Sequence, residues 1–105
     1  MRLPQLNRLN FDREVHNKSG LVLVLFESLQ CVQCRAVLTI IREIAQEAHP
    51  VAVASVNVDW NPRFAAAHDV HQIPTLILYK NGMEQTRIEG VCAKEEILER
   101  IAVHA

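Results

Sequence analysis

The sequence predicts an α/β domain whose central mixed β-sheet is flanked by helices on both faces. Two observations lead to this fold class: β-rich and helical segments alternate along the 105 residues, and the last two β-rich segments read as a hairpin. Strands joined by a helical crossover run parallel, whereas hairpin strands run antiparallel, so the sheet is mixed. The length suits one domain, and we expect residues 1–105 to form it.

The first elements are a short helix and a fully apolar strand. Residues 8–17 read as a helix that offers Leu9, Phe11 and Val15 to a core. Residues 21–26 are apolar at every position, which is typical of a strand that is covered on both faces.

The longest helix comes next. Polar side chains fill one side of it, and the pattern is that of an amphipathic helix packed on a sheet. Pro50 predicts that it ends near His49. Its apolar side is Val37, Ile40, Ile41, Ile44, Ala45 and Ala48.

The second half of the chain continues the alternation. Residues 51–59 read as a strand and residues 60–70 as a loop with a short helix. Residues 75–90 read as a hairpin, because Asn81-Gly82 supplies the two positive-φ positions of a type I′ turn. A helix over residues 93–102 closes the chain, with Ile97, Leu98 and Ile101 on its apolar side.

Composition and charge exclude several classes of function. The formal net charge of −1 gives no basic patch to hold a phosphate backbone, so we expect no nucleic-acid partner. No apolar run approaches the roughly 20 residues of a membrane span. The N-terminus lacks the apolar core of a secretion signal, which favours a cytoplasmic location. Three cysteines are too few for a disulfide scaffold.

Cys31 and Cys34 lie three residues apart where the apolar strand ends and the long helix begins. A helix N-terminus stabilises a thiolate and lowers its pKa below the free value of about 8.5. The spacing allows the Cα separation of roughly 4.4–6.8 Å that a disulfide tolerates. In a redox reading, Cys31 attacks a substrate disulfide and Cys34 resolves the mixed disulfide.

Two other interpretations of the pair stay open. Cysteine is a frequently buried small residue, and two can fall three apart by accident. A zinc site needs four ligands, and the closely spaced His68 and His71 do not match such a spacing, so we expect no metal. Ile73-Pro74-Thr75 before the hairpin adds a second signal, because proline is confined to strand starts and edges.

Taken together, these segments resemble the thioredoxin family over nearly the whole chain. The resemblance implies the thioredoxin fold, an exposed Cys31–Cys34 pair and a cis peptide bond at Pro74. It further implies that Ile73, Pro74 and Thr75 shape a groove for an extended substrate chain, and that electrons come from a reductase or a small thiol without a bound cofactor. The matching pieces are "LVLVLF", Cys31-Val32-Gln33-Cys34, "VNVDWNP", "IPT", "LYKNG" and Gly90.

Five departures from the family pattern converge on the thiols. Gln30 replaces a tryptophan, Val32-Gln33 replaces Gly-Pro, and Glu27 replaces an aromatic residue. Leu25 stands where the family has a buried aspartate, and Ser55 where it has the accompanying lysine. Without that acid, resolution by the second cysteine should slow, because a buried thiol keeps a raised pKa. We hypothesise that Glu27 partly replaces the missing carboxylate; the alternative is a solvated surface glutamate.

Three further residues complete the sequence-based expectations. Trp60 follows a strand end and either contacts substrate or is an ordinary loop aromatic. Cys92 reads as a small, partly buried residue and His71 as a solvated histidine. The leading function is a thiol–disulfide oxidoreductase acting on protein disulfides. The alternative is a redox-weak or inactive binding module for peptides or proteins.

Overall fold

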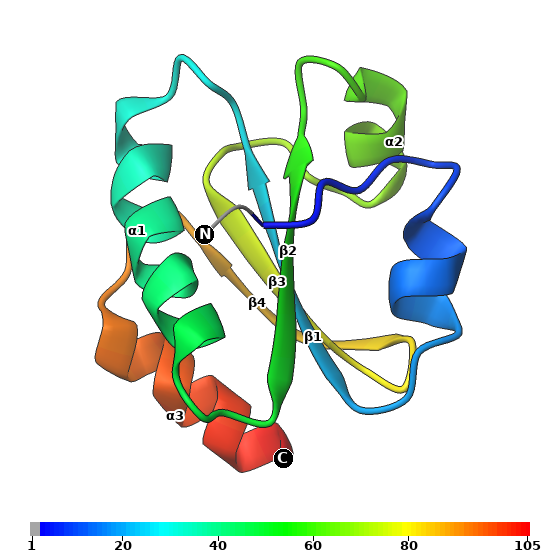
Figure 1. The fold of residues 1–105 in the computed structure, drawn as a ribbon. Helices are drawn as coiled ribbons and strands as arrows, with labels where there is room; N and C mark the ends of the chain where they lie inside the picture. Colours follow the sequence, from blue (N-terminus) through cyan, green and yellow to red (C-terminus); the bar gives the residue numbers. More distant parts are fainter. Residues whose placement is uncertain (1–2) are drawn as a thin grey trace.

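The computed structural model describes residues 3–105 and contains a four-stranded mixed sheet with the strand order β2-β1-β3-β4. Strand β1 is Leu21–Glu27, β2 is Val51–Asn57, β3 is Thr75–Lys80 and β4 is Met83–Glu89. β1 pairs with β2 in parallel and with β3 antiparallel, and β3 and β4 form the hairpin. The predicted mixed sheet is confirmed (Figure 1).

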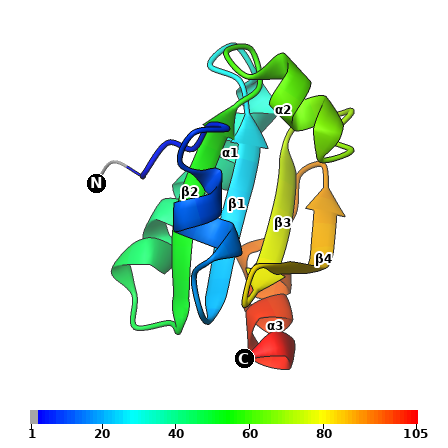
Figure 2. The same ribbon diagram turned by 90° about the vertical axis from the view of Figure 1, so that its right-hand side faces the viewer.

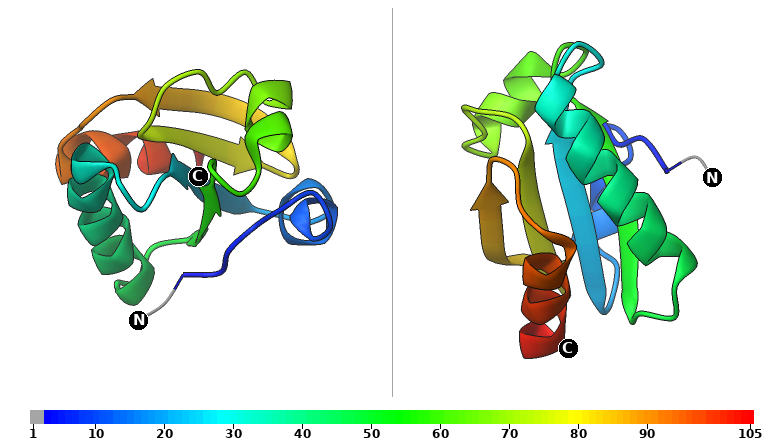
Figure 3. Two further views of the ribbon diagram at one scale, coloured as in Figure 1. Left: turned by 90° about the horizontal axis from the view of Figure 1, so that it is seen from above. Right: turned by 90° about the vertical axis from the view of Figure 1, so that its left-hand side faces the viewer.

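Helices cover both faces of this sheet, as the sequence predicts (Figures 2 and 3). Helix α1, Val32–Gln46, and helix α3, Lys94–His104, pack on one face. The single-turn π-helix η1, Asp12–His16, and helix α2, Pro62–Ala67, pack on the other. No helix within residues 3–105 has the length and apolar character needed to cross a membrane.

The unbroken apolar run of β1 is explained by these two layers. Alternate side chains of a strand point to opposite faces of the sheet. Leu21, Leu23 and Leu25 therefore join the cluster under α1 and α3. Val22 and Val24 join the cluster under η1 and α2 on the opposite face. β1 is thus a central strand that positions the loop leading to α1.

The hairpin turns at Asn81-Gly82, where φ is 52° and 86° respectively. Both values are positive, as a type I′ turn requires, so the predicted turn is confirmed. Gly82 is also fixed by a close approach, because an added Cβ would lie 2.1 Å from the backbone oxygen of His16. The turn is therefore closed against the end of η1.

Two predicted helix boundaries are wrong. The first helix is only Asp12–His16, and Leu9 is 79% exposed instead of lying in the core with Phe11 and Val15. The Asn7 side chain diverts the chain into a turn, since its Oδ1 accepts from the backbone N–H of Leu9 at 2.8 Å. The long helix ends at Gln46, so Ala48 lies beyond it and is exposed.

The N-terminal segment runs beside β2 before it reaches this turn. Gln5 forms a parallel bridge with Ser55. The backbone N–H of Leu6 donates to the Ser55 carbonyl at 2.7 Å, and the Ser55 N–H donates to the Pro4 carbonyl at 2.9 Å. This pairing places the turn at Asn7 and Leu9 beside the segment that follows β2.

Candidate active site

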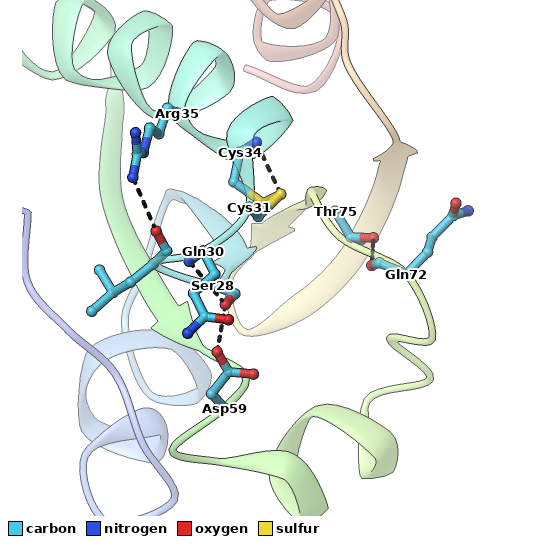
Figure 4. Close-up of a disulfide and its surroundings, with 9 residues drawn as sticks. Ser28, Gln30, Cys31, Cys34, Arg35, Asp59, Gln72 and Thr75 are labelled. Carbon is cyan, nitrogen blue, oxygen red and sulfur yellow. Dashed lines mark hydrogen bonds between the residues drawn. A yellow bond between two sulfur atoms is a disulfide. The ribbon is translucent and has the colours of Figure 1, made fainter.

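The two cysteines lie at the start of α1, after the short loop that follows β1 (Figure 4). Cys31 is the N-cap residue, with extended backbone angles, and its Sγ accepts from the backbone N–H of Cys34 at 3.1 Å. The pair forms a disulfide with a Cα–Cα separation of 5.2 Å. That separation lies inside the range of about 4.4–6.8 Å for disulfides, so the predicted pairing is confirmed.

The environments of the two sulfurs differ. Cys31 is partly exposed, whereas Cys34 has no exposed surface. The first turn of α1 contains no acidic residue, so the positive end of the helix dipole is not neutralised there. A negative charge on the Cys31 sulfur is stabilised by that dipole and by unpaired N–H groups. The Cys31 residue is thus the accessible member of the disulfide and Cys34 the buried one.

Ser28 and Asp59 brace the loop that carries Cys31, and sequence reasoning missed both. The Ser28 hydroxyl donates to the Asp59 carboxylate, joining the loops after β1 and β2 (Figure 4). Ser28 Oγ also accepts from the N–H of Gln30 at 3.3 Å. On the other side, Asn57 Oδ1 accepts from the N–H of Asp59 at 2.9 Å. The bracing pair is 31 residues apart, so no local pattern reveals it.

The Ile73-Pro74 peptide bond is cis, as the resemblance implies. Pro74 is buried, and its carbonyl accepts from the Gly90 N–H at 2.8 Å. Thr75 is fully buried, and its hydroxyl donates to the Gln72 carbonyl at 2.8 Å. Of Ile73, Pro74 and Thr75, only Ile73 is therefore partly exposed.

Glu27, the last residue of β1, follows Leu25 by two residues, and the alternation of a strand assigns both to the face that α1 covers. Burial raises the pKa of its carboxyl above the ordinary value, while the Arg42 charge and the Ser55 hydroxyl oppose that shift. Leu25 is fully buried and pairs in register with Ser55. An apolar side chain thus occupies the place of the family's acid, with a half-buried carboxyl two residues away.

Trp60 is 65% exposed and lines a groove of about 360 Å³. Leu9 and Phe64 line the same groove, and neither cysteine does. Other apolar side chains that sequence reasoning missed are exposed near the thiols along the chain. These are Leu29 and Val32, which flank Cys31 in the sequence. Val91, directly after Gly90, is exposed as well.

The other residues considered in the sequence are Cys92, His71 and His68. Cys92 is partly buried and free, and burial, followed by the Glu96 charge, raises the pKa of its thiol. His71 is exposed, as expected. His68 packs against the Phe64 ring at a centroid distance of 4.3 Å. Within residues 3–105, no three His, Cys, Asp or Glu side chains are grouped as metal ligands.

Comparisons with known proteins agree with this geometry. The thioredoxin family model matches residues 2–103. The chain is 40% identical to thioredoxin of Chlamydia pneumoniae over 96 aligned residues. The alignment covers 91% of this chain and 92% of that protein. The chain is 32% identical over 101 residues to thioredoxin 1 of Nostoc sp., with 95% and 94% covered. A mutant thioredoxin from Halobacterium salinarum shares the fold, with a TM-score of 0.88, 24% identity and coverage of 96% of this chain and 88% of its own.

Proposed function

This chain belongs to the thioredoxin family and is a thiol–disulfide oxidoreductase, and we propose that Cys31 and Cys34 perform its exchange with protein disulfides. The family membership favours this function over an inactive binding module. The observation that supports the assignment of roles is the contrast between a partly exposed Cys31 at a helix N-terminus and a fully buried Cys34.

In the proposed reaction, the Cys31 thiolate attacks one sulfur of the substrate disulfide. A Cys31–substrate disulfide forms as the substrate S–S bond breaks, and the leaving sulfur takes a proton from solvent. Cys34 then loses its proton and attacks Cys31 Sγ. The second substrate sulfur leaves, the substrate has gained two electrons and two protons, and the Cys31–Cys34 disulfide remains. A reductase or a small thiol returns the electrons, and no bound cofactor takes part.

We propose that Glu27 accepts the proton of Cys34, directly or through one water. A carboxyl whose pKa is raised by burial is closer in proton affinity to a thiol than an ordinary surface glutamate is. Gln at this position keeps the size and removes the acceptor. Glu27→Gln should therefore slow resolution of the mixed disulfide and flatten its pH dependence, while the exposed Glu89→Gln should do neither. An unchanged pH profile in Glu27→Gln would refute the role.

We propose that substrate lies over Ile73 and beside Cys31. Pro74 and Thr75 hold the backbone next to Ile73 in place. Trp60 is the outer substrate-contact residue. The buried positions of Pro74 and Thr75 support a positioning role for their side chains. Substitution of Ile73 by serine should raise KM for a peptide disulfide with kcat little changed.

We further propose that residues 1–105 act as one thioredoxin-like domain in the cytoplasm. Both core clusters share the same sheet, so unfolding should be a single cooperative transition. Cell fractionation with an antibody to the chain tests the location.

A trapping experiment tests the assignment of roles. The Cys34→Ser variant, incubated with a peptide disulfide, should accumulate a covalent adduct on Cys31, measured by intact mass and peptide mapping. The Cys31→Ser variant should accumulate none, and the Cys92→Ser variant should turn over as the unmodified chain does. An adduct on Cys34 in Cys31→Ser, formed as fast as that on Cys31, would overturn the assignment.

A further inference from the structure

A groove lined by Trp60, but by neither cysteine, lies between the N-terminal turn and the segment after β2. Its volume is about 360 Å³, within the range of roughly 300–1,000 Å³ for clefts that hold ligands. Figure 1 shows the N-terminal segment running from β2 toward α2, which brings the two walls together. One wall is Asn7, Arg8 and Leu9, and the other is Trp60, Asn61, Pro62, Arg63 and Phe64.

The groove combines an apolar floor with positive charge. Leu9 and Trp60 are exposed, and Phe64 is fixed from behind by the Phe11 ring at a centroid distance of 4.9 Å. Arg8 and Arg63 are both exposed, and neither forms an ion pair with any residue in 3–105. None of the lining residues in the described part of the chain, 3–105, is acidic. The charge of the groove is therefore complementary to a carboxylate next to an apolar side chain.

Both walls are held in place in the free protein. Asn7 Oδ1 accepts from the N–H groups of Leu9 and Asn10, at 2.8 and 3.2 Å, which fixes the turn that presents Arg8. Asn57 Oδ1 accepts from the N–H of Trp60 at 3.3 Å. Ordering the backbone of these loops on binding therefore costs little entropy. Tryptophan and arginine are also among the residue types most often found at binding hot spots.

The groove belongs to the same end of the sheet as the redox pair. Trp60 follows the carboxyl end of β2, and Cys31 follows the carboxyl end of the parallel neighbour β1. The Ser28–Asp59 hydrogen bond ties the two loops together. A protein whose disulfide rests on Cys31 can reach the groove with a neighbouring segment.

We propose that this groove is an accessory docking site for an acidic, apolar segment of the protein substrates, a proposal that rests on the exchange function above. Carboxylates of the segment pair with Arg8 and Arg63, and an aromatic or aliphatic side chain packs on Leu9, Trp60 and Phe64. The site raises the affinity for such substrates without touching the reacting sulfurs.

Binding is tested in the Cys31→Ser/Cys34→Ser variant, where no exchange occurs. Trp60 is the single tryptophan of the chain, so its fluorescence reports occupation of the groove. The probe is a cysteine-free peptide with glutamates on both sides of a phenylalanine, and the control peptide has glutamines in their place. We expect a saturable change with the acidic peptide, weakened by added salt, and about tenfold weaker binding of the control peptide.

Groove variants identify the residues. Arg8→Gln combined with Arg63→Gln should weaken the acidic peptide about tenfold, while Arg13→Gln, a similarly exposed arginine on η1, should leave it unchanged. Leu9→Ser should also weaken binding, whereas Val103→Ser on α3 should not. Equal affinity for the two peptides, no effect of the arginine variants, or equally strong competition by inorganic phosphate would overturn the proposal.

A kinetic arm separates the groove from the exchange function. Two peptide disulfides carrying the acidic or the glutamine segment are offered to the chain with both cysteines intact. We expect a lower KM for the acidic peptide at unchanged kcat, and loss of that difference in Arg8→Gln/Arg63→Gln. Reduction of both peptides with equal KM overturns the docking site and leaves the exchange function standing. Reduction of neither overturns the exchange function, and the Trp60 titration then decides the groove alone.

Discussion

Removing the hydroxyl of Ser28 should uncouple the loops that follow β1 and β2. In Ser28→Ala, the Asp59 carboxylate loses its hydroxyl donor and the Gln30 N–H loses its acceptor. Hydrogen bonds to charged groups contribute about 1.5–3 kcal/mol. Asp59 is exposed and water can replace the donor, so the lower end of that range applies. We expect a loss of about 1.5 kcal/mol in the free energy of unfolding.

The assay is urea unfolding of four proteins: the unmodified chain, Ser28→Ala, Asp59→Ala and the double variant. A coupling energy of about 1 kcal/mol is expected, because each single change already breaks the same hydrogen bond. Thr39→Ala is the control, since the Thr39 hydroxyl donates to the Arg35 carbonyl within the same helix, α1. This change should cost less than about 0.5 kcal/mol. Additive effects of the two single changes, within about 0.3 kcal/mol, would refute the reasoning.

Three other perturbations have outcomes that the contacts determine. Burial raises the pKa of Glu27 in the folded chain, so protons bind more readily there than in the unfolded chain, and this group favours folding most below its ordinary pKa. The urea midpoint of the unmodified chain relative to Glu27→Gln should therefore fall as pH rises from about 4 to 7, and parallel pH profiles would contradict this. Arg87 donates to the carbonyls of His68 and Asp69 at 3.0 Å each, and so holds the loop that follows α2. Arg87→Met should therefore cost about 1–2 kcal/mol of stability and raise KM more than it lowers kcat. A change in kcat alone would argue against a role of Arg87 in positioning that loop. Gly82→Ala places a Cβ 2.1 Å from the His16 oxygen, whereas Gly90→Ala meets nothing within 4 Å at a similar positive φ. The thermal midpoint should therefore fall much further in Gly82→Ala, and equal falls would show that backbone strain alone matters.

The elements that sequence reasoning recovers are those whose signals are local. The apolar run of β1 and the Asn81-Gly82 turn each depend on a few adjacent residues, and the structure confirms both. The Cys31–Cys34 spacing is equally local, so the amino-acid sequence alone is enough to indicate the redox pair. In such stretches, side-chain period and backbone preference point to one conformation.

The parts that sequence reasoning misses depend on contacts between distant segments. Leu9 has the spacing of a core residue, but the Asn7 side chain captures its N–H and turns it outward. The Ser28–Asp59 hydrogen bond joins two loops that only the parallel pairing of β1 with β2 brings together. The burial of Thr75, which the family pattern suggests as a substrate contact, likewise follows from packing around its neighbours in the sheet.

The most direct test of the central claim is the redox titration of the Cys31–Cys34 couple. The Cys92→Ser variant, which lacks the third thiol, is equilibrated with a series of glutathione redox buffers. Each sample is quenched by thiol alkylation, and its intact mass is measured by mass spectrometry. We predict a reversible gain of two alkyl groups with a single midpoint, following a two-electron curve in which tenfold in the equilibrium constant corresponds to about 30 mV. The transition should disappear in Cys34→Ser. A pair that forms no intramolecular disulfide at any buffer ratio, or that gains the alkyl groups in two separate steps, would contradict the account.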